Sequence, residues 1–170
     1  MKYSILIILF IFNTQYLRSQ CTTKVDDMTK VKKTESLQVN IGASKMCKSC
    51  PKESLKISIM KLERNGKESF SIFFDADYTD VWSIREGDNI YIKTANDSVF
   101  IIPYVGDFRV SNYYRPGFNS LLFYQTFTRE QLEYFYLNKI IKIRIKSNDY
   151  EIKNPEDISD QIDCVLKSKQ

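Results

Sequence analysis

The chain has 170 residues, of which 43% are hydrophobic and 14% aromatic, so it can bury a core and is not a disordered polymer. With residues 1–20 set aside, 23 basic and 21 acidic residues leave a net charge of +2, which does not indicate a nucleic-acid-binding protein. The chain has no histidine, which excludes Ser-His-Asp and Cys-His catalysis, histidine-ligated zinc and histidine pH switches.

Residues 1–20 are predicted to be a signal peptide. A single cation, Lys2, precedes an apolar run over residues 5–12, and a short polar tail follows it. The run is short for a membrane span, which needs about 20 apolar residues. We therefore expect cleavage after Gln20, an extracytoplasmic location (secreted or periplasmic) and no membrane span in the mature protein. The alternative is an uncleaved membrane anchor.

Cys21 stands directly after the expected cut, where a bacterial lipoprotein carries its lipid. The residues before it are Arg18, Ser19 and Gln20, and they lack the small apolar side chains expected at such a site. The protein would be lipid-anchored if Cys21 were acylated, and this remains an alternative to release.

Beyond the signal, residues 21–36 are polar and mixed in charge, which predicts a flexible N-terminal arm before a single domain over residues 37–170. Short segments in which apolar and polar residues alternate then recur every ~8–12 residues, as in an antiparallel meander. The predicted strands are residues 37–41, 55–62, 70–74, 81–84, 90–92, 99–102 and 121–127. Asn65-Gly66 is a strong hairpin signal, because both residues tolerate the positive φ of a type I′ turn.

Two helices are predicted near the C-terminus, over residues 129–137 and 155–168. Thr128 and Gln131 have the spacing of a capping box, and Asn154-Pro155 provides a cap and a first-turn proline. A strand over residues 141–145 separates the helices. The predicted fold class is α+β: an antiparallel β-sheet meander with two C-terminal helices packed on it.

The C-terminal 45 residues carry a loose resemblance. The segment from Thr128 to Leu132, the strand from Ile141 to Ile145 and a closing helix with a cysteine resemble small uncharacterised secreted or envelope proteins of Bacteroidota. The resemblance implies a secreted or envelope location and no particular activity.

The mature chain has four cysteines, Cys21, Cys47, Cys50 and Cys164, which allow three pairings. In an oxidising compartment, Cys47-x-x-Cys50 is expected to be structural. We expect Cys164, which lies off the apolar face of its helix, to pair with Cys47 or Cys50 over a long range. A redox-active Cys47-x-x-Cys50 is the alternative. It would need a long helix after Cys50, whereas a strand there favours the structural role.

Two segments are candidates for binding. The aromatic segment 108–118 contains Arg109, Tyr113, Tyr114 and Arg115, residue types that dominate binding hot spots, and aromatic platforms suit sugar rings. The alternative is that these side chains fold back onto the sheet. Lys142, Arg144 and Lys146 alternate along one strand, which indicates either an anion-binding stripe or a solvated strand face.

These observations predict a non-catalytic extracytoplasmic domain that binds a protein or glycan partner or supports an envelope assembly. The alternative is a thiol-disulfide redox protein that uses Cys47 and Cys50, and a structural lipoprotein is a third reading. The acidic residues over 75–86 do not have EF-hand spacing, so we expect neither a metal nor a cofactor.

Overall fold

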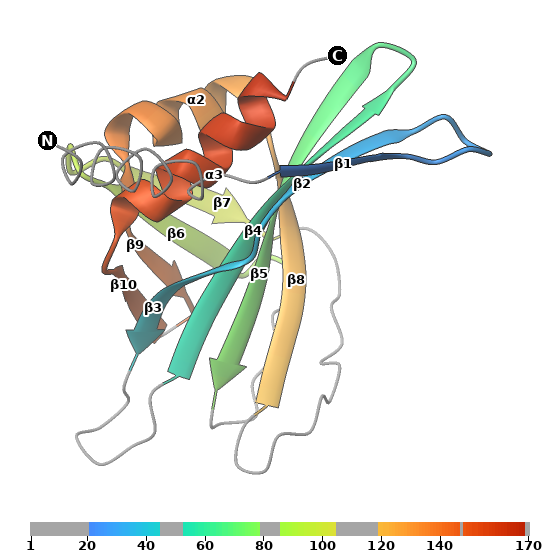
Figure 1. Cartoon of the computed structure of the whole chain (residues 1–170). Helices are drawn as coiled ribbons and strands as arrows, with labels where there is room; N and C mark the ends of the chain where they lie inside the picture. Colours follow the sequence, from blue (N-terminus) through green and yellow to red (C-terminus); the bar gives the residue numbers. More distant parts are fainter. Residues whose placement is uncertain (1–20, 45–52, 79–85, 105–118, 147, 169–170) are drawn as a thin grey trace, which may run out of the picture.

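The computed structural model of the chain (Figure 1) describes residues 21–44, 53–78, 86–104, 119–146 and 148–168. The fold is α+β, with an antiparallel sheet and two helices, as predicted. The strands are β1 (Cys21–Val25), β2 (Lys32–Ser36), β3 (Val39–Ser44), β4 (Glu53–Arg64), β5 (Lys67–Tyr78), β6 (Asn89–Thr94), β7 (Val99–Pro103), β8 (Asn119–Phe127), β9 (Ile140–Ile145) and β10 (Asn148–Ile152). The helices are α2 (Arg129–Asn138) and α3 (Pro155–Lys167).

The sheet branches at its long central strand, β4. One edge of β4 pairs with β5 along its length, and β5 pairs in turn with β8. The other edge is shared, because β3 pairs with the first half of β4 and β2 with the second half. The β3 branch continues through β10, β9 and β6 to β7, and this second group of strands lies behind the first (Figure 1). The order is therefore more complex than a simple meander, although every pairing is antiparallel.

The β4–β5 hairpin forms as the sequence predicts. Arg64 pairs with Lys67, which leaves Asn65 and Gly66 as a two-residue turn with φ of 53° and 73°. Those positive φ values are the ones that asparagine and glycine accept at low cost, so the turn fixes the register of both strands.

The core lies inside the curled sheet. In β4, the alternate residues Leu55, Ile57 and Ile59 are buried, as the two-residue period of a strand requires. The end of β7 reaches β8, because Gln125 Nε2 donates a hydrogen bond to the Pro103 carbonyl at 3.4 Å. The sheet therefore encloses its apolar side chains between its front and rear strands.

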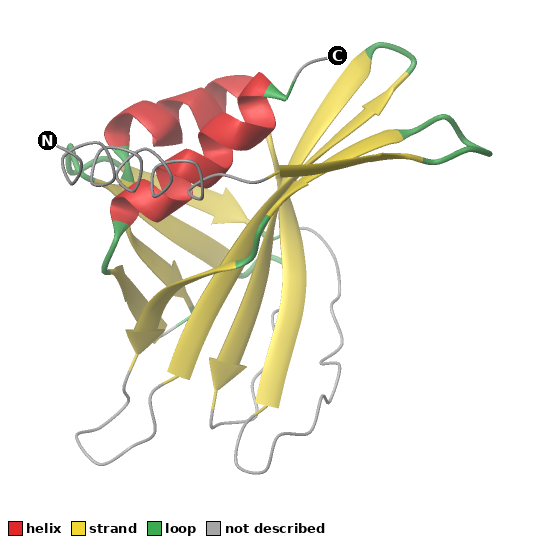
Figure 2. Cartoon of the chain, in the orientation of Figure 1, coloured by secondary structure: helices red, strands yellow, loops and turns green. Residues whose placement is uncertain are grey.

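The helices cover one end of this core (Figure 2). Thr128 caps α2 with the predicted capping box, and α3 begins at Pro155. α3 packs on the sheet through a buried face that includes Ile158, Ile162 and Val165. α2 packs against α3 and places Phe135 in edge contact with rings on β7 and β8.

One expectation needs correction, and one strand was not predicted. Residues 21–36 do not form a flexible arm, because β1 and β2 form a hairpin that pairs with β4. Its buried residues are Thr34 and Ser36, so the segment lacks the apolar alternation that marks a strand in sequence. The strand that was not predicted is β10, which joins β3 to β9. The predicted strand over 81–84 lies outside the described residues.

Candidate functional site

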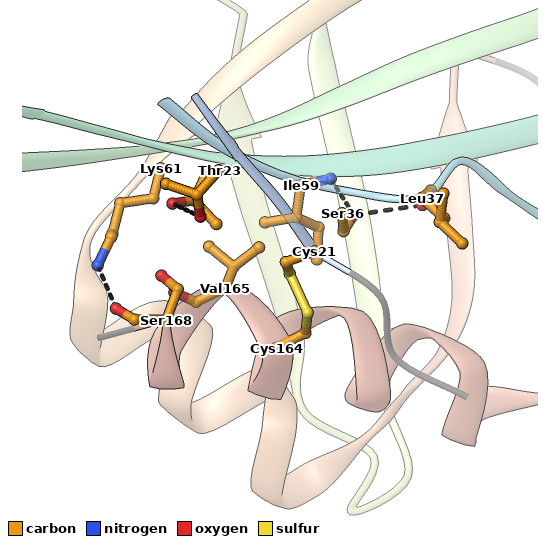
Figure 3. Close-up of a disulfide and its surroundings, with 10 residues drawn as sticks. Cys21, Thr23, Ser36, Leu37, Ile59, Lys61, Cys164, Val165 and Ser168 are labelled. Atoms are coloured by element: carbon orange, nitrogen blue, oxygen red, sulfur yellow. Dashed lines mark hydrogen bonds between the residues drawn. A yellow bond between two sulfur atoms is a disulfide. The ribbon is translucent and has the colours of Figure 1, made fainter. Parts of the chain in front are cut away.

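A disulfide joins the first described strand to the last helix. Cys21 of β1 and Cys164 of α3 are bonded, with their Cα atoms 5.9 Å apart (Figure 3). The predicted pairing of Cys164 with Cys47 or Cys50 is therefore wrong. The pairing was predicted wrongly because residues 21–36 were expected to form a flexible arm. The β1–β2 hairpin instead places Cys21 beside α3. Cys47 and Cys50 lie outside the described residues.

A buried lysine lies close to this junction. The Lys61 side chain is 2% exposed, on the inner side of β4, and its Nζ donates to the Ser168 carbonyl at 3.1 Å (Figure 3). The same Nζ donates to Glu68 Oε1 at 3.3 Å. Ser168 caps the C-terminal end of α3, and the C-terminal end of a helix carries partial negative charge, which favours a cation there. Glu68 also accepts from Arg129 Nη2 at 2.6 Å, and that hydrogen bond holds the pKa of Glu68 below its ordinary value. The group anchors α2 and α3 to the β4–β5 hairpin.

A polar cluster fastens the β6–β7 turn to α2. The Tyr134 hydroxyl donates to Ser98 Oγ at 3.0 Å and accepts from Asn96 Nδ2 at 2.8 Å. The bond from Asn96 lowers the pKa of Tyr134, because a hydrogen bond to the phenolate oxygen favours the charged form. The Ala95 amide donates to the Asn138 carbonyl at the end of the helix. We interpret this cluster as structural.

The outer faces of β10, β9, β6 and β7 carry two ordered rows of side chains. The strand register places Asp149, Arg144, Tyr91 and Ile101 side by side in one row. It places Glu151, Lys142, Lys93 and Val99 in the neighbouring row. Across the four strands, each row therefore changes from acidic on β10 to cationic on β9 and then to apolar on β7.

A shallow depression of about 210 Å³ lies between these rows. Its lining residues are Tyr91, Lys93, Val99, Lys142 and Arg144, which we call the basic face. Three of the five are cations and none is a carboxylate. Lys93 and Lys142 are directly opposite each other on β6 and β9, and like charges in such a pair destabilise a sheet.

Each cation of the basic face has a carboxylate partner at the margin. Lys93 pairs with Asp97 in the β6–β7 turn at 2.8 Å. Lys142 pairs with Glu151 on β10, and this contact raises the pKa of Lys142. Arg144 binds both carboxylate oxygens of Asp149, and these hydrogen bonds lower the Asp149 pKa.

The predicted basic stripe is thus divided. Lys142 and Arg144 lie on the outer face of β9, whereas Lys146 follows the strand with a φ of 54° and pairs with Asp88 at 3.3 Å. Tyr91 and Lys93 of β6 and Val99 of β7 were not predicted as site residues. Only Tyr91 and Lys93 had a sequence signal, as the outward residues of an alternating segment.

The other predicted site residues cannot be compared with these. Arg109, Tyr113, Tyr114 and Arg115 lie outside the described residues. In the part of the chain that the structure describes, no group of three or more cysteine, aspartate or glutamate side chains is placed to hold a metal ion. Neither α2 nor α3 is long and apolar enough to cross a membrane.

Comparisons with protein-family models, with curated proteins and with solved structures find no match to this chain.

Proposed function

We propose that the protein is an exported, non-catalytic binding domain and that its ligand contacts the basic face. The observation that carries the proposal is the composition of that depression, which is lined by three cations, an aromatic ring and an apolar side chain, with the carboxylates at its margin. Ligand sites generally combine apolar and aromatic side chains with a few polar or charged groups that fix the orientation of the ligand.

The disulfide supports the exported location. Disulfides persist in oxidising compartments, and Cys21 follows directly on the signal-like residues 1–20. The bond also bears on anchoring, because a sulfur bonded to Cys164 cannot also carry the thioether of a lipid. This favours release of the mature protein over a lipid anchor at Cys21.

The redox alternative has less support. A reactive Cys-x-x-Cys generally precedes a helix whose N-terminus lowers the pKa of the first thiol. Here β4 begins at Glu53, three residues after Cys50, so a strand follows the motif. The strand favours a structural role for Cys47 and Cys50.

Nuclear magnetic resonance tests the proposal. The exported, isotope-labelled protein is titrated with a library of soluble oligosaccharides and peptides, and amide shifts are mapped onto the chain. We expect a ligand that shifts the amides of Tyr91, Lys93 and Arg144, leaves those of Lys33 and Met60 on other strands unchanged, and is recovered chemically intact. Ligands that shift only other surfaces would refute the basic face, and a chemically altered ligand would identify an enzyme.

A further inference from the structure

We infer that the basic face binds a carboxylate-bearing sugar unit of an acidic glycan. The inference rests on the proposed function and adds the chemical class of the ligand. It depends on three features of the depression: its charge, its apolar contacts and the state of the backbone beneath it.

The charge of the depression favours an anion. Lys93 and Lys142 face each other directly, and Arg144 lies in the adjacent row. Asp149, which binds Arg144 and lies 3.6 Å from Lys142 Nζ, has a side chain that is 34% exposed, whereas the side chains of Asp97 and Glu151 are 83% and 66% exposed. Ion pairs with such exposed partners contribute little, so an incoming carboxylate can compete for the two lysines. It would also relieve the repulsion between them.

The apolar contacts and the size favour a ring. Tyr91 lies between Arg144 and Ile101 in its row, and Val99 borders Lys93 in the other. Val99 and Ile101 are 54% and 60% exposed, so both are available to the hydrocarbon face of a ligand. A volume of about 210 Å³ is below the ~300–1,000 Å³ of drug-sized pockets, which suits one sugar unit of a chain lying along the surface.

The backbone distinguishes a glycan from a peptide. β6 is paired with both β7 and β9, and β9 with both β6 and β10, so their amides and carbonyls are engaged in the sheet. An extended peptide that lay across this face would find no unpaired strand to pair with. Its own amides and carbonyls would lose their hydrogen bonds to water and gain none from the sheet. A glycan has no such backbone, and its hydroxyl and carboxylate groups can bind to side chains.

Calorimetry with two matched probes tests the inference. The exported protein is titrated at low salt with tetragalacturonate and with the neutral galactose tetramer that has the same linkages. We expect binding of the acidic probe and at least tenfold weaker binding of the neutral one. Lys93→Gln and Lys142→Gln should each weaken acidic binding about tenfold, the loss of one charge-assisted hydrogen bond. Tyr91→Phe should retain binding, and Tyr91→Ser should lose it.

Lys33→Gln is the matched control, because Lys33 is also a strand lysine with one carboxylate partner, Glu35, at 2.8 Å. Equal weakening by Lys33→Gln and Lys93→Gln would show unspecific charge attraction and overturn the inference. Poly-glutamate that binds more tightly than tetragalacturonate, with the same dependence on Lys93, would overturn it in favour of an acidic peptide. Amide shifts at the basic face from uncharged ligands alone would refute the inference and leave the proposed function intact, whereas a face that no ligand shifts would refute both.

Discussion

Cys21 and Cys164 are separated by 143 residues in the chain, and one disulfide brings their Cα atoms to 5.9 Å. Cys21 begins β1, which pairs only with β2 among the described strands, whereas Cys164 belongs to the helix packed on the core. The bond therefore ties a peripheral strand to the centre of the domain. In the chain-entropy model, closing a loop of this length stabilises the fold by about 5 kcal/mol, and measured gains are often smaller.

Loss of this disulfide is expected to destabilise the protein. Cys164→Ser should lower the free energy of unfolding by about 2–5 kcal/mol, because the unfolded chain regains the freedom that the bond removes. Guanidinium unfolding followed by circular dichroism measures the change. Cys21→Ser and the double variant should lose the same amount, since all three lack one bond. An additional loss in the double variant would show that the cysteines contribute separately.

The sequence predicts those parts of the fold in which turn or cap residues stand next to a regular alternation of apolar residues. Asn65-Gly66 and the Thr128 capping box were both identified, since turn and cap residues act within a few positions of themselves. The β1–β2 hairpin was not identified, because its inward residues are hydroxylic. Ser36 Oγ accepts from the Ile59 amide at 2.8 Å, and Thr34 bonds to Thr23 across the hairpin. These partners become visible only in the folded sheet.

The candidate site was predictable to a smaller extent. The alternation of Lys142 and Arg144 marks a charged strand face, and the structure confirms that face. The neighbours of that face depend on register: β9 and β6 are separated by more than 40 residues and become adjacent only through tertiary pairing. Lys61 gave a weaker signal, as a cation at an inward position of an apolar alternation, and its partners Glu68 and Ser168 come from other elements.

The buried charge of Lys61 should make Glu68 important for stability. Glu68→Gln is expected to cost about 3 kcal/mol, because it leaves a cation that is 2% exposed without its carboxylate. Adding Lys61→Met should recover part of the loss, since the uncompensated charge is removed. Urea unfolding of the two single variants and the double variant gives the coupling. A double variant that loses the sum of the single effects would exclude a direct interaction between the two side chains.

Glu68 also predicts a dependence of stability on pH. Its hydrogen bond from Arg129 lowers its folded-state pKa below the ordinary glutamate value of 4.5. A lowered folded pKa means that the stabilisation is present in full above pH 4.5 and is lost as the pH falls through the folded pKa. The stability difference between wild type and Glu68→Gln should therefore be constant near neutral pH and shrink in acid. A difference that persists unchanged at pH 2 would contradict this assignment.

The polar cluster at the β6–β7 turn gives the last prediction. Tyr134→Phe removes a hydroxyl that makes two hydrogen bonds, to Ser98 and from Asn96, and it keeps the ring that packs on Phe100 at 5.0 Å. We expect the free energy of unfolding to fall, because Ser98 and Asn96 lose their hydrogen bonds to the hydroxyl. Hydrogen exchange at the Ala95 amide, which donates to the end of α2, should accelerate by a similar free energy.

Tyr136→Phe is the control for this prediction, because Tyr136 lies on the same helix and its side chain is exposed. Removing a hydroxyl from an exposed position should change stability by no more than about 0.5 kcal/mol and leave exchange at Ala95 unaltered. The comparison separates the hydroxyl's hydrogen bonds from any general effect of replacing tyrosine in α2. Equal effects of the two substitutions would mean that the Tyr134 hydroxyl does not hold the turn, and that the contacts of Ala95 with the end of α2 and the packing of Phe100 suffice to position it.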